Sequence, residues 1–301
     1  RQSMAAFRSC LLFFSIAVAT GSAGAQAPEP LTLEKVLTQG AALGLQPPSV
    51  LWRPGGHEAT VIMAADDGSE SLHAMQDGKV APEPLATAAA LRDLLGGKSQ
   101  GPARFPPLAW LDADTLRVER GDRIDQWHLA ENKLTAALGW PGAATARAVA
   151  PGDSHVAYVD GHQLHVRSAN GRDRQLTFDG SDDIVYGGAA HRAEFGITEG
   201  LFWSADGRYL AFYREDQRPI APYPYQDLDT VPPRPRHGRY PMAGRADSVV
   251  QVGVYDTRSE NLQWLEHDDA LDLYWTNITF GPDDTVWVAL VDRGQSQLEL
   301  A

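Results

Sequence analysis

The amino-acid sequence predicts an all-β protein, a partial β-propeller with about five to six blades of three to four antiparallel strands. The first reason is a hairpin unit, made of an apolar strand, a tight turn and a second apolar strand, that recurs along the chain. The second reason is the spacing of the copies, since repeats of about 40 to 50 residues built from short strands are typical of propellers.

Five segments follow the hairpin pattern in chain order. The paired strands are Val50–Trp52 with Ala59–Ala64, Leu108–Leu111 with Leu116–Glu119, Ala146–Ala150 with Val156–Val159, Leu201–Ser204 with Tyr209–Tyr213, and Ile278–Phe280 with Val286–Leu290. Their turns are rich in Asp, which bonds back to its own backbone, and in Gly, which adopts the positive φ that closes a hairpin. Tryptophans at 52, 110, 203 and 275 stand beside these turns, and we expect them in the cores of the blades.

Two insertions interrupt the repeats. The segment from Ala86 to Leu95 is rich in Ala and Leu, which predicts a short helix. The segment from Pro219 to Gly244 holds seven prolines, so it cannot form a regular central strand. We expect an extended excursion that packs through its tyrosines, Tyr223, Tyr225 and Tyr240.

The N-terminal residues have the features of an export signal. Arg8 precedes an apolar run from Leu11 to Thr20, and small residues follow at Ala23 to Ala27. We therefore predict a signal peptide over residues 1–27, an adapter segment over 28–47 and a propeller over 48–301 that is incomplete at its C-terminus. The expected location is periplasmic or secreted.

Composition excludes several kinds of site. The formal net charge of -13 argues against a nucleic-acid partner, because a phosphate backbone requires a basic face. The only cysteine, Cys10, lies within the predicted signal peptide, which leaves no thiol for disulfides, catalysis or metal binding. The histidines are scattered without ligand spacing, so we expect neither a metal site nor a cofactor.

A charged stretch, His191-Arg192-Ala193-Glu194-Phe195, lies between apolar strands just before the fourth hairpin. Charge placed in such a connection is where a binding site would be expected. The fourth hairpin ends in Arg214, Glu215 and Asp216, where we expect a solvated ion-pair cluster.

Several segments in order resemble the N-terminal β-propeller of the dipeptidyl peptidase IV family of serine peptidases. They are Asp182–Tyr186, His191–Gly196, Phe202–Phe212, Arg239–Gly244, Val252–Asp256, Tyr274–Ile278 and Asp292–Gln295. Arg239-Tyr240-Pro241-Met242-Ala243-Gly244 is similar to that family's R/K-Y-P-x-A-G signature. The resemblance implies a catalytic α/β-hydrolase domain that follows the propeller and carries a Ser, Asp, His triad. Because the resemblance covers the propeller and not the hydrolase domain, we expect no catalytic residue in this chain and no activity from it alone.

The resemblance also implies where substrate binds. The family's propeller carries a pair of glutamates that bind the free α-amino group of a peptide, and Glu194 matches the second of them. Ala193 stands at the first, which leaves dipeptidyl specificity open. Arg192 and His191 are the further candidate substrate-binding residues, either by pairing with Glu194 or by meeting the substrate. Arg293 is expected to make an inter-blade contact.

The expected function is therefore that of a substrate-gating, N-terminus-anchoring propeller of an exported dipeptidyl-peptidase-like serine exopeptidase. Its expected partners are a peptide with a free N-terminus and the C-terminal hydrolase domain of the same protein, and a homodimer is compatible with the sequence. Two alternatives stay open: a non-enzymatic periplasmic β-propeller scaffold, and a peptidase of the oligopeptidase or acylaminoacyl type.

Overall fold

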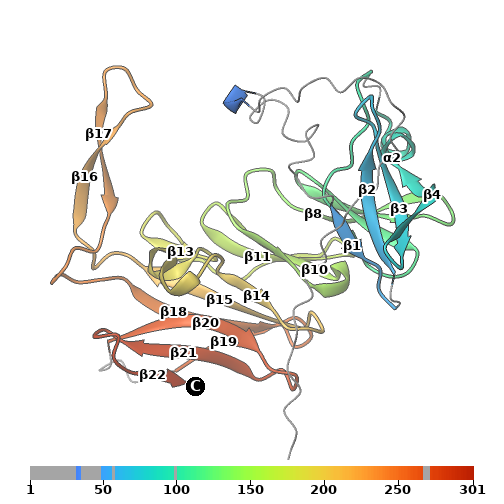
Figure 1. The fold of residues 1–301 in the computed structure, drawn as a ribbon. Helices are drawn as coiled ribbons and strands as arrows, with labels where there is room; N and C mark the ends of the chain where they lie inside the picture. The colour runs from blue at the N-terminus through green and yellow to red at the C-terminus, as the bar shows by residue number, and fades with distance from the viewer. Residues whose placement is uncertain (1–31, 35–48, 56–57, 98–99, 267–271) are drawn as a thin grey trace, which may run out of the picture. The chain divides into compact units, whose positions relative to one another are not determined.

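The computed structural model describes residues 32–34, 49–55, 58–97, 100–266 and 272–301 (Figure 1). The predicted signal peptide and nearly all of the predicted adapter lie outside these residues. The chain divides into two units, Arg1–Pro47 and Pro48–Ala301, and the second holds the fold described below. Within the described part of the chain, no helix is long and apolar enough to cross a membrane.

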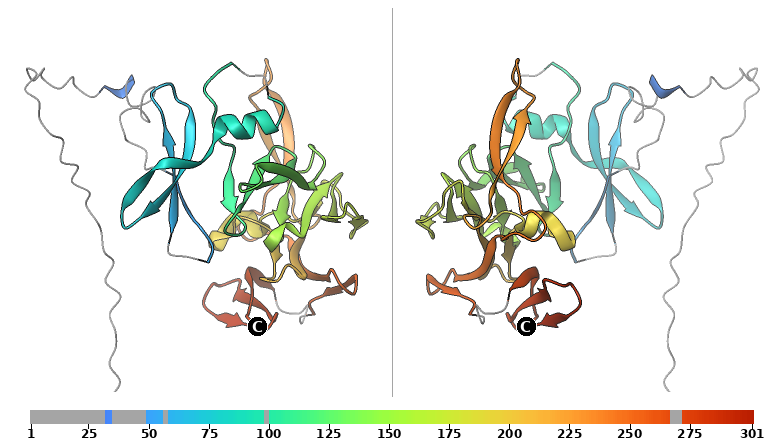
Figure 2. Two further views of the ribbon diagram at one scale, coloured as in Figure 1. Left: turned by 90° about the vertical axis from the view of Figure 1, so that its right-hand side faces the viewer. Right: turned by 90° about the vertical axis from the view of Figure 1, so that its left-hand side faces the viewer.

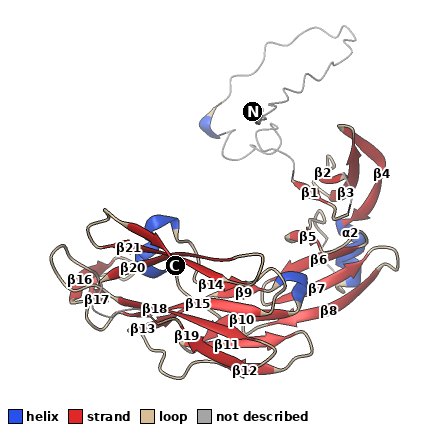
Figure 3. Cartoon of the chain, turned by 90° about the horizontal axis from the view of Figure 1, so that it is seen from below, coloured by secondary structure: helices blue, strands red, loops and turns tan. Residues whose placement is uncertain are grey.

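The regular structure of the second unit is almost entirely strand, and all but two of its strands form five consecutive antiparallel sheets, here called blades 1 to 5 (Figure 3). Blade 1 holds β1 (Val50–Trp52), β2 (Ala59–Ala64), β3 (Glu70–Gln76) and β4 (Lys79–Thr87); blade 2 holds β5 (Leu108–Trp110), β6 (Thr115–Arg120), β7 (Arg123–His128) and β8 (Lys133–Gly139). Blade 3 holds β9 (Arg147–Val149), β10 (His155–Asp160), β11 (Gln163–Ser168) and β12 (Asp173–Gln175); blade 4 holds β13 (Ile184–Tyr186), β14 (Leu201–Trp203), β15 (Tyr209–Asp216), β18 (Val249–Asp256) and β19 (Asn261–Trp264). Blade 5 holds β20 (Leu273–Phe280), β21 (Val286–Asp292) and β22 (Leu298–Leu300). The all-β prediction is confirmed, and each of the five predicted hairpins pairs two neighbouring strands of one blade.

Three short helical segments accompany the strands in the described residues of the second unit: α2 (Ala88–Leu94), η1 (Pro151–Asp153) and η2 (Ala190–Gly196). α2 confirms the helix predicted from the alanine-rich stretch. It begins at Thr87, whose Oγ1 accepts a hydrogen bond from the backbone N–H of Ala90 at 3.2 Å and so satisfies a free donor of the first turn. Leu91 on its buried face joins the core between blades 1 and 2.

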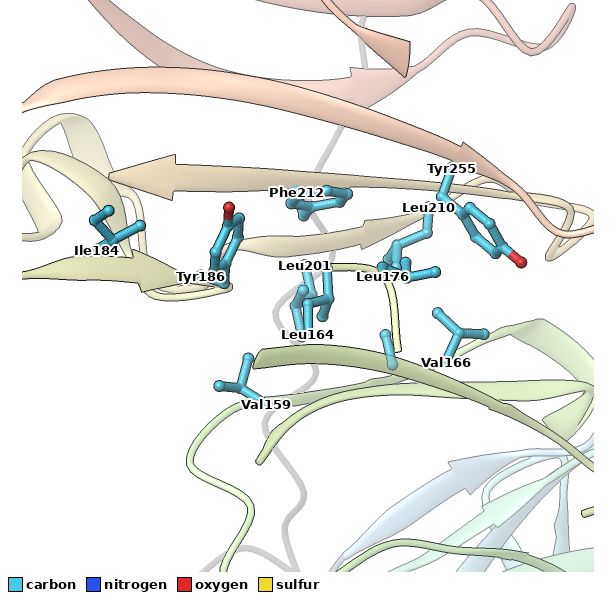
Figure 4. Close-up of a cluster of buried hydrophobic side chains, with 11 residues drawn as sticks. Val159, Leu164, Val166, Leu176, Ile184, Tyr186, Leu201, Leu210, Phe212 and Tyr255 are labelled. Carbon is cyan, nitrogen blue, oxygen red and sulfur yellow. The ribbon is translucent and has the colours of Figure 1, made fainter. Parts of the chain in front are cut away.

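Four apolar clusters hold the blades together, and each lies between two consecutive blades. The cluster between blades 3 and 4 shows the principle, because Val159, Leu164 and Val166 of blade 3 face side chains of blade 4 (Figure 4). Strands whose side chains alternate between two buried faces are expected when sheets pack face to face.

The strand β15 is buried on both faces. Leu210 and Phe212 join the cluster with blade 3, whereas Ala211 and Tyr213 join the cluster with blade 5. β15 therefore contributes to two interfaces at once. Each large apolar side chain that it buries stabilises the fold by roughly 1.5 to 3 kcal/mol.

The proline-rich excursion forms a two-stranded antiparallel sheet of β16 (Pro222–Asp227) and β17 (Arg234–Arg239). It extends away from the blades in Figure 1, and Figure 2 shows the same hairpin, in orange, from two other sides. The excursion is therefore more regular than expected, and prolines are tolerated because each strand of a pair keeps one unpaired edge. The ring centroids of Tyr223 and Tyr240 lie 5.6 Å apart, so two of the three tyrosines pack against each other.

Two expectations about burial are wrong. Trp52 is 73% exposed, because the face of β1 that carries it has no neighbouring blade in the described residues. Glu215 and Asp216 at the end of β15 are buried instead of solvated, and Glu215 accepts a hydrogen bond from the Ser248 hydroxyl at 2.7 Å. Arg214 is half-buried and bonds Asp179 at 2.8 Å, so this part of the expected ion-pair cluster is present.

Gly253 offers a direct test of the packing of blade 4. A Cβ atom at this position of β18 would lie 2.5 Å from Cζ of the fully buried Phe212 ring. We predict that Gly253→Ala lowers the free energy of unfolding by about 1 to 3 kcal/mol, because the ring cannot move without repacking the cluster. Gly142→Ala is the control, since its Cβ would meet open space, and chemical denaturation compares the two. Equal stability of the two variants would contradict this packing.

Candidate functional site

The segment η2 occupies a break in blade 4. β14 pairs with one half of β15, where Leu201 lies opposite Phe212, and β13 pairs with the other half, where Tyr186 lies opposite Arg214. The two short strands together take the place of a single first strand, and η2 is in the segment between them. η2, which holds the charged stretch, is thus connected through β13 and β14 to β15, a continuous and buried strand.

His191 fixes η2 to blade 5. It is 4% exposed, and its Nε2 accepts a hydrogen bond from the backbone N–H of Trp275 in β20 at 3.2 Å. Its ring meets Tyr274 edge-on, with centroids 5.0 Å apart and planes at 85°. His191 and Phe195 both adopt positive φ, 51° and 57°, a conformation that persists in non-glycine residues only when the surroundings enforce it.

Burial lowers the pKa of His191 from its ordinary value to about 4, with a smaller opposing effect from the nearby Asp247 carboxylate. The neutral ring is the form that fits the site, because an Nε2 that accepts a hydrogen bond carries no proton. Protonation would place two donors, Nε2–H and the Trp275 N–H, against each other.

A pocket of about 370 Å³ opens beside η2. Its walls come from η2, from the loop that follows β17, and from the first residues of β20 with the turn after β21. The lining residues are His191, Glu194, Pro241, Met242, Ala243, Gly244, Arg245, Ala246, Asp247, Asp272, Tyr274 and Arg293.

Arg293 organises one side of the pocket. Its Nη1 donates to Asp247 at 2.6 Å and its Nε donates to Asp272 at 2.7 Å. The guanidinium lies over the ring of Tyr274, 4.1 Å from the centroid. Because Asp247 precedes β18 of blade 4, this contact joins blades 4 and 5, and the prediction that Arg293 makes an inter-blade contact is confirmed.

Glu194 and Arg245 are the other charged residues of the pocket. Both are exposed, and neither side chain has a hydrogen-bond or ion-pair partner among the described residues. The pocket therefore offers one carboxylate and one guanidinium to a ligand, besides the charges that Arg293 already joins.

The loop that carries Arg245 is tied at both ends. At its start, the guanidinium of Arg239 bonds the two oxygens of Asp183, each at 2.8 Å. The Arg239 bonds hold the pKa of the Asp183 carboxyl below its usual range. At its end, Asp247 is held by Arg293. Two segments singled out in the sequence, Asp182–Tyr186 and Arg239–Gly244, thus meet in the structure.

The structure brings two of the three predicted site residues, Glu194 and His191, to one pocket. His191 is a buried support for η2, and Glu194 faces the open space. The side chain of Arg192 lies outside the described residues. Sequence reasoning missed Arg245 and Asp272; the R/K-Y-P-x-A-G signature that ends one residue before Arg245 was the signal that could have directed attention to this loop.

Comparison with known proteins gives the class to which this fold and pocket belong. The family described as the dipeptidyl peptidase IV N-terminal region matches residues 117–301, which is more than half of the chain. The chain therefore belongs to this family.

Individual relatives agree with this assignment. A dipeptidyl-aminopeptidase B of Aspergillus niger is 25% identical over 169 residues, which cover 50% of this chain and 19% of that protein. A solved structure from Bacteroides ovatus, assigned as a dipeptidyl aminopeptidase IV, is 27% identical and matches with a TM-score of 0.69, over 83% of this chain and 34% of that one. Porphyromonas gingivalis dipeptidyl peptidase 4, at 19% identity and a TM-score of 0.61 over 91% of this chain and 40% of that one, shares the fold. This chain spans only a minor part of the length of each.

The buried His191 generates a prediction about pH. Its folded pKa of about 4 lies below the unfolded value of 6.5, so its contribution to stability is complete above pH 6.5 and is lost as the pH falls toward 4. Between pH 7 and pH 5 this loss amounts to about 2 kcal/mol in the free energy of unfolding.

We expect His191→Gln, whose amide oxygen can still accept the Trp275 N–H, to lose less stability over the same pH interval by about that amount. Denaturation curves at pH 7 and pH 5 measure the difference. His237→Gln, on the exposed strand β17, serves as the control and should behave as the parent does. An identical pH dependence in the parent and in His191→Gln would contradict the assigned role.

Proposed function

We propose that this chain is the substrate-anchoring propeller of an exported serine exopeptidase of the dipeptidyl peptidase type, and that Glu194 binds the free amino terminus of the peptide substrate. In this proposal the Ser, Asp, His triad belongs to an α/β-hydrolase domain of the same protein. The propeller holds the substrate and gates its access to that domain.

The observation that carries the proposal is the position of Glu194. Its carboxylate is exposed at a pocket, has no partner among the described side chains, and stands on a segment fixed by a buried histidine and by strained backbone. An ammonium group is the natural complement of such a carboxylate, because a charge-assisted hydrogen bond is stronger than a neutral one. The family membership and the names of the relatives support a peptide as the ligand.

His191 has a positioning role in this proposal. It contacts Trp275 and Tyr274 but presents no accessible polar atom, so it acts on a substrate only through the placement of Glu194. Ala193 leaves one glutamate where the resemblance implies two. Ala193 is therefore the reason to keep open the alternative of a peptidase of the oligopeptidase or acylaminoacyl type.

The test is the selectivity of Glu194→Gln for free over blocked amino termini. In the protein with its hydrolase domain, we predict a fall in kcat/KM of about 10- to 100-fold on peptides with a free N-terminus, and little change on N-acetylated peptides. Glu199→Gln is the matched control, because Glu199 is exposed in the same insertion but lines a different pocket. Equal losses on both kinds of peptide would refute the anchoring role.

The enzymatic proposal itself has a separate test. A fluorophosphonate probe labels activated serines, and the protein that contains this chain should be labelled and should release short N-terminal fragments from peptides. Absence of both results would favour the scaffold alternative.

A further inference from the structure

The pocket beside η2 contains more charge than the capture of one ammonium group requires. Three carboxylates and two guanidiniums line it. Asp247 and Asp272 are both bound by Arg293, which leaves Glu194 and Arg245 as the charges without a partner in the described part of the chain. A ligand that pairs with both charges therefore needs a positive and a negative group that fit within one pocket of about 370 Å³.

Arg245 is held in a defined place. Its backbone N–H donates to the carbonyl of Met242 at 3.0 Å, which closes a tight turn in which Gly244 adopts a φ of 72°. The loop on either side is tied by Arg239 to Asp183 and by Asp247 to Arg293. The root of the guanidinium side chain is thus ordered before a ligand arrives, which reduces the entropy lost on binding.

We propose that this pocket selects peptides whose first residue is Asp or Glu, with Arg245 binding the side-chain carboxylate while Glu194 binds the α-ammonium group. The inference rests on the proposed function, in which Glu194 holds the amino terminus. Among the standard amino acids, only an acidic first residue places an anion within a few bonds of the α-ammonium. Arg245 can receive that carboxylate through two parallel N–H···O bonds.

The same arrangement disfavours other first residues. A neutral side chain cannot form an ion pair with Arg245, whose guanidinium then stays hydrated, so the peptide gains no affinity from this residue. A Lys or Arg side chain brings a second cation toward a guanidinium and is repelled. Because both pocket charges are exposed, the preference is modest and weakens as salt is added.

Peptide binding to the 301-residue chain tests this directly by isothermal titration calorimetry at low salt. The probes are four peptides that differ only at the start: Asp-Ala-Ala-Gly, Asn-Ala-Ala-Gly, Lys-Ala-Ala-Gly and N-acetyl-Asp-Ala-Ala-Gly. We expect the Asp peptide to bind about 3- to 10-fold more tightly than the Asn peptide, the Lys peptide to bind most weakly of the free-amine peptides, and the acetylated peptide to lose most of its affinity.

Arg245→Gln should bind the Asp and Asn peptides equally and should still distinguish free from acetylated N-termini. Arg258→Gln is the matched control, because Arg258 is an exposed arginine outside the pocket, and it should retain the preference of the parent. Equal binding of the Asp and Asn peptides to the parent chain, or an acidic preference that survives Arg245→Gln, would overturn the inference.

The two proposals fail in different ways. If free-amine peptides bind better than acetylated ones and Glu194→Gln removes that difference, the anchoring function stands whatever the Asp and Asn peptides show. If acetylation has no effect in the parent, or if no peptide binds, the anchoring function is overturned and the inference about Arg245 falls with it.

Discussion

The burial of both faces of each inner blade is the constraint on which this structure depends. β15 shows it most clearly, because its alternating side chains enter two different clusters, one with blade 3 and one with blade 5. A strand in this position has no face left for function. Any polar chemistry must therefore come from the ends of strands or from breaks in their partners, and η2 is such a break.

The break is held in place by contacts with blade 5. His191 replaces the missing strand contact with a hydrogen bond to β20, and the positive φ values of His191 and Phe195 turn the chain back toward β14. Arg293 closes the same corner from blade 5 by binding Asp247 and covering Tyr274. The charges of the pocket that have no partner among the described residues after these contacts are Glu194 and Arg245, and a ligand can pair with them.

Local signals in the sequence were sufficient for the hairpins, because a turn such as Ala205-Asp206-Gly207 depends only on its own residues. They also located η2, since a charged stretch between apolar strands is visible without a partner. Burial of Glu215 and exposure of Trp52 could not be predicted, because both depend on which distant segments pack against them. Arg245 was missed for the same reason. A single arginine in a loop can be recognised as a ligand-binding candidate only once the structure shows that Arg293 already binds Asp247 and Asp272.

The placement of every core cluster between two consecutive blades has a consequence for cooperativity. Each blade is coupled to its nearest neighbours, so the chain behaves as a one-dimensional array in which interfacial free energy holds successive units together. In such an array, opening one blade costs the free energy of both of its interfaces. Because β15 lies between two clusters, its amide hydrogens are expected to exchange slowly, and the pocket beside η2 is attached to this protected strand through β13 and β14.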